Sequence, residues 1–263
     1  MSRYAAMFER LRAANEGALG AFLMLGDPDP ATCLDLLDAA VAGGADMIEV
    51  GIPFSDPVAD GPVIQQAAIR ALAAGVRTAD AMAIVAEFRV RHLTVPIGIL
   101  TYANIVVARG LDAFVRGLAQ VGADSLLVAD VPSLEVAPWA KACRNVGIDP
   151  VLIAAPNTPT ATIARIAVMA SGYTYCVARS GVTGASDELA LDHQGLFEAL
   201  AAAGAPPPVL GFGISKPDHV RAALRAGAQG VIVGSALVRL VEGANPAEAI
   251  RRKVAELKAA TKR

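Results

Sequence analysis

The sequence predicts an α/β fold and, within that class, a single (β/α)8 barrel of the TIM type with extra helices. Three observations support this prediction: the length of 263 residues, the alternation of short apolar runs with helical segments, and a faint internal repeat. A chain of this length is natural for one α/β barrel, so we expect residues 1–263 to form one domain. The hydrophobic share of 54% and the mean hydropathy of +0.48 suit parallel strands that are covered on both faces.

Short apolar runs predict eight strands, at residues 21–24, 47–51, 97–100, 125–129, 150–154, 173–178, 209–212 and 230–234. Helical segments separate these runs, and the alternation indicates βαβ units and a parallel sheet. Eight such units favour closure into a barrel. An open, doubly wound sheet is the alternative, and the lack of a Gly-x-Gly-x-x-Gly turn after the first strand disfavours it.

The internal repeat relates residues 42–51, 121–130 and 226–235. Each copy has a helix end, a glycine suited to the left-handed position after a helix, a short turn and a strand. In each copy a polar residue stands at the carboxyl end of the strand: Glu49, Asp130 and Ser235. Active sites of β/α barrels lie at this end, so the repeat predicts where the chemistry takes place.

Two connections are longer than compact domains usually contain, at residues 52–61 and 179–190. Both follow the carboxyl ends of expected strands, so we interpret them as lids over the site, with simple surface insertions as the alternative. Extra helices are expected at residues 4–15, 62–74 and 246–258.

Composition argues against several classes of function. The net charge is −2 without a basic cluster, which disfavours nucleic acid as a partner. No apolar stretch reaches ~18 residues and the first residues do not resemble a signal peptide, so we expect a cytoplasmic protein without a membrane span. Cys33, Cys143 and Cys176 lie far apart, as do the three histidines, so we predict reduced thiols and no metal site.

Glu49 is the strongest candidate for a catalytic group. Side chains alternate along a strand, so Met47 and Glu49 share one face while Ile48 and Val50 share the other. The β-branched pair suits the face covered by helices, which points Glu49 into the barrel. A carboxylate there is costly unless it is solvated, paired or used, and no strand-end Lys or Arg is available to pair with it. Asp60 is a weaker candidate on these grounds, because an Asp before Gly-Pro is also an ordinary turn former or helix N-cap.

Two glycine-rich turns predict a phosphate site. Gly211-Phe-Gly-Ile-Ser215 follows the seventh expected strand and Gly234-Ser235 follows the eighth. Barrels commonly bind phosphate with these two loops, because glycine lets backbone N–H groups approach the anion. Two ordinary turns are the alternative interpretation.

An apolar pocket suited to a flat aromatic substrate is expected at the same end. The residues at or near the strand ends are Phe22, Leu100, Tyr102, Leu127, Ala129, Ile153, Tyr175 and Phe212. Simple filling of the barrel interior is the alternative. The chain has five lysines, none in an expected strand, which disfavours a Schiff-base aldolase. The type of catalysis that the sequence favours is therefore metal-free acid–base chemistry by carboxylates.

These motifs resemble the tryptophan synthase alpha subunit family. The matching segments are residues 25–28, 49–65, 102–104, 129–132, 155–157, 172–175, 179–184, 211–215 and 234–235. The resemblance implies retro-aldol cleavage of indole-3-glycerol phosphate to indole and glyceraldehyde 3-phosphate, with no cofactor. Another phosphate-binding barrel enzyme of aromatic amino-acid synthesis is one alternative. A non-catalytic barrel that activates a partner enzyme is the other.

The resemblance also implies roles for individual residues. Glu49 would protonate indole C3 and deprotonate the glycerol hydroxyl. Asp60 would accept a hydrogen bond from the ring N–H or stabilise charge there, and Tyr175 would support the site. Phe22, Leu100, Tyr102, Leu127, Ala129, Ile153, Thr183 and Phe212 would bind the substrate, and Gly184, Gly213, Gly234 and Ser235 its phosphate. The implied partner is a pyridoxal-phosphate beta subunit in an alpha2-beta2 heterotetramer, which would contact Pro53, Phe54, Asp56, Asn104 and Pro132.

Overall fold

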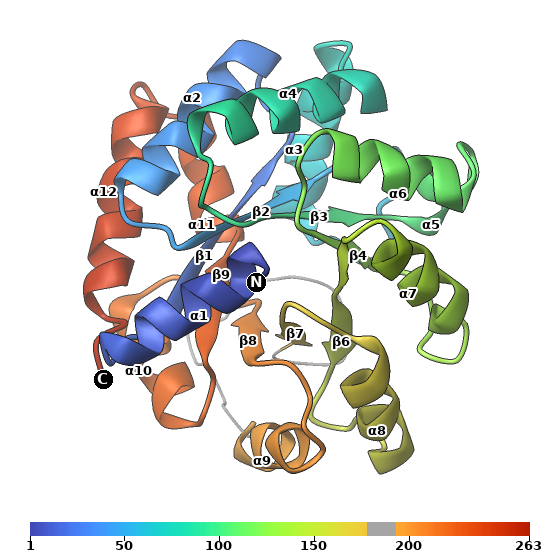
Figure 1. Ribbon diagram of the computed structural model, residues 1–263. Helices are drawn as coiled ribbons and strands as arrows, with labels where there is room; N and C mark the ends of the chain where they lie inside the picture. Colours follow the sequence, from blue (N-terminus) through green and yellow to red (C-terminus); the bar gives the residue numbers. More distant parts are fainter. Residues whose placement is uncertain (178–192) are drawn as a thin grey trace.

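The computed structural model describes residues 1–177 and 193–263, and within them parallel strands form a nearly closed barrel surrounded by helices (Figure 1). This confirms the predicted fold class. The strands are β1 (Ala18–Met24), β2 (Met47–Gly51), β3 (Ile97–Thr101), β4 (Ser125–Val128), β5 (Asp149–Pro150), β6 (Leu152–Ala154), β7 (Thr174–Val177), β8 (Pro208–Gly211) and β9 (Gly230–Val233).

The described residues thus contain nine strands where eight were expected, because the strand expected at residues 150–154 is divided. Asp149 and Pro150 pair with β4, whereas Leu152 to Ala154 pair with β7. The hydrogen-bonded order is β5-β4-β3-β2-β1-β9-β8-β7-β6, so its two ends are neighbours along the chain. Val151 connects β5 to β6, so the two ends of the hydrogen-bonded sheet are joined by the chain itself.

The helices of the described part of the chain are α1 (Arg3–Ala13), α2 (Pro30–Ala42), α3 (Pro62–Ala73), α4 (Thr78–Arg91), α5 (Ala103–Val107), α6 (Leu111–Gln120), α7 (Val136–Asn145), α8 (Thr160–Met169), α9 (Gln194–Ala202), α10 (Pro217–Arg225), α11 (Ser235–Val238), the 3-10 helix η1 (Arg239–Glu242) and α12 (Pro246–Ala259). The expected extra helices correspond to α1, α3 and α12. Figure 1 shows α1 in front of β1 and β9, and the other helices around the sheet. Among the described residues, no helix has the length and hydropathy needed to cross a bilayer.

Local sequence explains the helix ends. The Asp29 carboxylate accepts hydrogen bonds from the N–H groups of Ala31 and Thr32 at 3.0 Å, which caps the start of α2. The glycines of the internal repeat stand in the left-handed region, with φ of 98° at Gly44 and 79° at Gly122. A residue with a side chain is strained there, which is why glycine begins the turn into the next strand.

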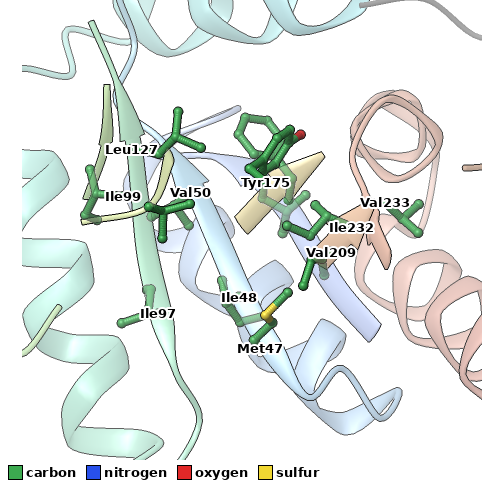
Figure 2. Close-up of a cluster of buried hydrophobic side chains, with 14 of the residues drawn as sticks. Met47, Ile48, Val50, Ile97, Ile99, Leu127, Tyr175, Val209, Ile232 and Val233 are labelled. Carbon is green, nitrogen blue, oxygen red and sulfur yellow. The ribbon is translucent and has the colours of Figure 1, made fainter. Parts of the chain in front are cut away.

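The side-chain alternation predicted for the second strand is confirmed. A methyl group placed on Gly20 would approach the side chains of Met47 and Ile232 to 2.9 and 2.7 Å, so these two residues converge inside the barrel. Parallel pairing places Glu49 in register with Phe22 and Gly98. All residues of β2 are buried, as expected for strands enclosed by helices and by the packed interior (Figure 2).

Candidate active site

Glu49 is a buried carboxyl group, and its side chain belongs to a residue that is 2% exposed. The Tyr173 hydroxyl donates to Glu49 Oε1 at 2.7 Å, whereas Oε2 has no hydrogen-bond partner among the described residues. An unpaired oxygen of a buried carboxyl group is costly, since it has lost water without gaining a replacement. The second oxygen is therefore available to another molecule.

Burial changes the acidity of Glu49. Desolvation raises the pKa of this carboxyl group to about 7, because the charged form loses its water. The hydrogen bond from Tyr173 lowers the pKa, and the nearby charge of Asp60 raises it. A pKa close to neutrality allows one group to donate a proton and later to accept one.

Asp60 lies in the connection between β2 and α3 and lines a cavity together with Phe22 and Tyr175. The Tyr102 hydroxyl hydrogen-bonds to its carboxylate, which lowers the pKa, but desolvation dominates and raises the pKa of Asp60 to about 6. The alternative that Asp60 is a helix cap does not hold, since the N-cap of α3 is Gly61. Its side chain remains directed to the cavity rather than to the helix.

A polar layer involving Tyr173 lies on the N-terminal side of Glu49. The rings of Tyr173 and Tyr4 are 5.3 Å apart, and the Tyr4 hydroxyl is 2.9 Å from Ser125 Oγ. A methyl group on Gly98 would lie 2.5 Å from Ser125 Oγ, so glycine leaves room for this layer. Sequence reasoning chose Tyr175 and missed Tyr173. Both fall on the same face of the strand expected at residues 173–178, and that spacing was the available signal.

The cavity next to Asp60 contains many of the predicted substrate residues. The predicted substrate and phosphate residues that line this cavity are Phe22, Leu100, Tyr175, Phe212, Gly213, Gly234 and Ser235. Its remaining lining was not predicted and consists of Ile64, Ile214, Ser215, Ile232, Ala236 and Arg239. Phe212 has φ of 71°, which is rare for an aromatic residue, and its ring meets Tyr175 edge-on at 5.9 Å. Strained backbone of this kind gathers at binding sites.

The loop between β8 and α10 is held from behind by a histidine. His219 Nδ1 is 3.0 Å from the carbonyl oxygen of Gly213 and 3.4 Å from the backbone nitrogen of Ser215. The protonated Nδ1 donates to Gly213, and the unprotonated Nδ1 accepts from Ser215. Gly213 itself has φ of 77°, a conformation that suits glycine. The loop therefore presents a fixed backbone to the cavity.

Other predicted substrate residues lie elsewhere. Ala129 and Ile153 line a second cavity, of about 410 Å³, which continues outward between α7 and α8 beside Trp139. Ile153 is 37% exposed, since β4 and β6 separate at the seam. Leu127 is buried. Thr183 and Gly184, with the lid expected at residues 179–190, lie outside the described residues.

The predicted partner residues differ in exposure. Asp56, Asn104 and Pro132 are exposed, Pro53 is buried, and Phe54 is half-buried. The Phe54 ring stacks on the Tyr102 ring, with 5.4 Å between the ring centroids. The expected lid at residues 52–61 therefore joins an exposed surface to the tyrosine that binds Asp60.

The described residues contain no group of three or more His, Cys, Asp or Glu side chains placed to hold a metal ion. The observed strands likewise contain no lysine. The chemistry supported by this part of the chain is proton transfer by the two carboxyl groups, on a ligand held by an apolar wall and glycine-rich loops.

Comparison with known proteins gives one consistent answer. The family model described as tryptophan synthase alpha chain matches residues 8–263. The tryptophan synthase alpha chain of Aeromonas hydrophila is 47% identical over 268 residues, with both chains covered completely. The solved alpha subunit of Legionella pneumophila superposes with a TM-score of 0.88 at 30% identity, covering 99% of this chain and 98% of that one.

A chain of the Pyrococcus furiosus tryptophan synthase complex gives a TM-score of 0.84 at 37% identity, covering 92% of this chain and 98% of its own. The match to the family model extends over nearly all of the sequence, and the identity to full-length relatives is high. This chain belongs to the tryptophan synthase alpha chain family.

Proposed function

We propose that the chain cleaves indole-3-glycerol phosphate to indole and glyceraldehyde 3-phosphate, as part of tryptophan biosynthesis. The observation that carries this proposal is Glu49, a buried carboxyl group with a pKa of about 7 and a free Oε2. Asp60 supplies a second carboxyl group with a raised pKa, close enough that its charge raises the pKa of Glu49. Perturbed pairs of this kind are characteristic of active sites.

The reaction needs two proton transfers and no external electron sink. Protonation of the indole ring at C3 gives an indolenium, and the protein's own carboxyl group, Glu49, donates this proton. Removal of the proton from the adjacent glycerol hydroxyl then forms the aldehyde. The electron pair of the broken carbon–carbon bond returns to the ring and restores indole. Positioned acid–base groups contribute ~10²–10⁴-fold each.

Asp60 suits the ring N–H. Cationic charge develops on the ring nitrogen as C3 gains its proton, and a carboxylate that accepts the N–H hydrogen bond stabilises this charge. Tyr102 holds Asp60 in place by donating to it. The Phe22, Leu100 and Tyr175 side chains provide the apolar wall for the indole. At the other end, Gly213, Gly234 and Ser235 would bind the phosphate.

We also propose a beta-subunit partner, a pyridoxal-phosphate enzyme that receives the indole in an alpha2-beta2 heterotetramer. The solved Pyrococcus furiosus relative is described as an a2b2 complex. Large apolar side chains are exposed in the connections that follow β2, β3 and β4, with Val58 at 71%, Val107 at 62% and Leu134 at 75%. Exposed apolar groups around the mouth of a site suit a protein partner. The partner residues Pro53, Phe54, Asp56, Asn104 and Pro132 come from the same connections.

The remaining expectations extend this proposal. Residues 1–263 would form one barrel domain, and the enzyme would work in the cytoplasm. The three cysteines are buried free thiols, which suits a reducing compartment.

A direct assay tests the function. Purified chain is incubated with indole-3-glycerol phosphate, with and without a beta subunit, and released indole is measured. We expect slow release by the chain alone and much faster release with the partner. Absence of indole under both conditions would refute the proposed reaction.

A further inference from the structure

Arg239 is a cation at the cavity that no role above uses. It is the first residue of η1, follows Ser235 by four positions, and lines the cavity together with Gly213, Gly234 and Ser235. The side chain is exposed. Among the described residues it takes part in no ion pair and donates no side-chain hydrogen bond, whereas Arg70 pairs with Asp27 and Glu242.

The acidic groups nearby are already engaged. Glu242 stands three residues after Arg239, a spacing that favours pairing on a helix. It pairs instead with Arg70, at 3.2 Å. Arg70 also binds both oxygens of Asp27 at 2.8 Å. The Arg70 guanidinium thus engages both Asp27 and Glu242, and neither carboxylate pairs with Arg239.

The neighbours of Arg239 are the groups assigned to phosphate. The loop of Gly213 to Ser215 faces the cavity and is fixed by His219. Ser235 adds a hydroxyl group, and Gly234 brings backbone close to the cavity. These groups are neutral, and the whole chain has a net charge of −2. A phosphate dianion therefore needs a local positive charge, and a guanidinium offers paired N–H donors that match phosphate oxygens.

We propose that Arg239 binds the phosphate group of the substrate and makes the enzyme selective for the phosphorylated form. This inference rests on the proposed function. Arg239 lines the cavity with Gly234 and Ser235, whereas Glu49 is not among the lining residues, so the contribution of Arg239 is to binding rather than to the chemical step. Interactions that are equal in the bound substrate and the transition state change KM and leave kcat unchanged.

The test compares Arg239→Gln with wild type on two substrates, indole-3-glycerol phosphate and its dephosphorylated form, indole-3-glycerol. We expect KM for the phosphorylated substrate to rise about tenfold in the variant, with kcat within about twofold, as for loss of one exposed charge-assisted contact. The kcat/KM for indole-3-glycerol should not change. An equal loss on both substrates, or an unchanged KM, would overturn the role of Arg239.

Two further variants sharpen the result. Arg239→Lys keeps the charge without the fork of donors and should recover part of the lost affinity. Arg12→Gln removes the same charge from α1, at the opposite end of the barrel, and should leave both substrates unaffected. Because the contact is exposed, the gap between wild type and Arg239→Gln should narrow in ~1 M salt.

Binding of glycerol 3-phosphate, followed by calorimetry, separates this inference from the proposed reaction. Wild type without indole-forming activity would refute the reaction, yet weaker binding of glycerol 3-phosphate by Arg239→Gln would still support the phosphate contact. Equal affinity of wild type and variant for glycerol 3-phosphate would refute the contact, whatever the activity.

Discussion

The two ends of the barrel both bury carboxyl groups, but they treat them differently. At the N-terminal end, Asp124 accepts hydrogen bonds from Arg3, Arg89 and the N–H of Ile97, at 2.9, 2.7 and 2.7 Å. At the C-terminal end, Glu49 has a single hydrogen bond and one unpaired oxygen within the described part of the chain. The same fold therefore pairs its buried carboxylates fully at the N-terminal end and incompletely at the end where we propose that substrate binds.

Asp46 shows that the pairing at the N-terminal end is systematic. It accepts from Arg10 at 2.9 Å, from the N–H of Leu19 at 3.0 Å and from Lys258 at 2.8 Å. Asp46 and Asp124 occupy equivalent places in the internal repeat, directly before β2 and β4. Each ties a neighbouring strand and two helices to the start of its own strand, α1 and α12 in the case of Asp46 and α1 and α4 in the case of Asp124. The contrast with Glu49 and Asp60 leads to four predictions.

Glu49→Gln should produce the largest effect on activity and little loss of stability. The amide neither donates nor accepts the catalytic proton, so the rate of indole formation should fall ~10²–10⁴-fold. The thermal unfolding temperature at neutral pH should not fall below that of wild type, because the variant removes a carboxyl group whose charged form is costly to bury. Indole release within about twofold of the wild-type rate would contradict the assignment of Glu49.

Asp124→Ala should reverse this pattern. It leaves the buried Arg89 guanidinium without its carboxylate, and breaking a buried pair costs about 3–5 kcal/mol. Urea unfolding measures this loss, while kcat/KM of the folded protein should be unchanged. Asp218→Ala removes an exposed ion pair with Arg221 on α10 and serves as the control with no measurable change. Equal stability of Asp124→Ala and Asp218→Ala would contradict the comparison.

The pH dependence of stability should carry the signature of Glu49. The pKa is about 7 in the folded protein against a reference of 4.5, so between these values the folded state retains a proton that the unfolded state has lost. The free energy of unfolding therefore declines by up to about 3 kcal/mol as pH rises from 4.5 to about 7. Above this window it no longer changes through Glu49. The difference between wild type and Glu49→Gln in urea unfolding isolates this contribution, and a difference independent of pH would contradict it.

Two tyrosine variants make the finest test. Tyr173→Phe removes the hydrogen bond that lowers the pKa of Glu49, so the part of the pH–rate profile controlled by Glu49 should move to higher pH. Tyr4→Phe removes only the bond to Ser125 and should cost about 1 kcal/mol of stability without moving the profile. Identical profiles for Tyr173→Phe and Tyr4→Phe would show that the hydroxyl of Tyr173 does not control Glu49.

The sequence was sufficient to predict the barrel and the orientation of Glu49, because both follow from local periodicity. The sequence could not show whether Tyr173 or Tyr175 contacts Glu49. Both tyrosines point inward, and the stagger of strands on opposite sides of the barrel decides which of them reaches Glu49. In the structure, Tyr173 donates a hydrogen bond to Glu49, and Tyr175 packs against Phe212.

The sequence likewise could not predict that β5 and β6 are separate strands. Residues 150–154 form one apolar run, and the change of partner at Val151 depends on β4 and β7 rather than on the run itself. This change explains why Ala129 and Ile153 line a second cavity. Arg239 lay outside every motif considered, and its place beside Ser235 became visible only once the cavity was formed.

The pairing of β1 has a consequence for synthesis of the chain. β1 lies between β2 and β9, so the first strand to leave the ribosome waits for the last one to complete its hydrogen bonds. Until Gly230–Val233 follows, one edge of an apolar strand stays open to other chains. Barrel closure therefore depends on contacts between residues far apart in sequence, and the unfinished chain is exposed to aggregation until β9 has paired with β1.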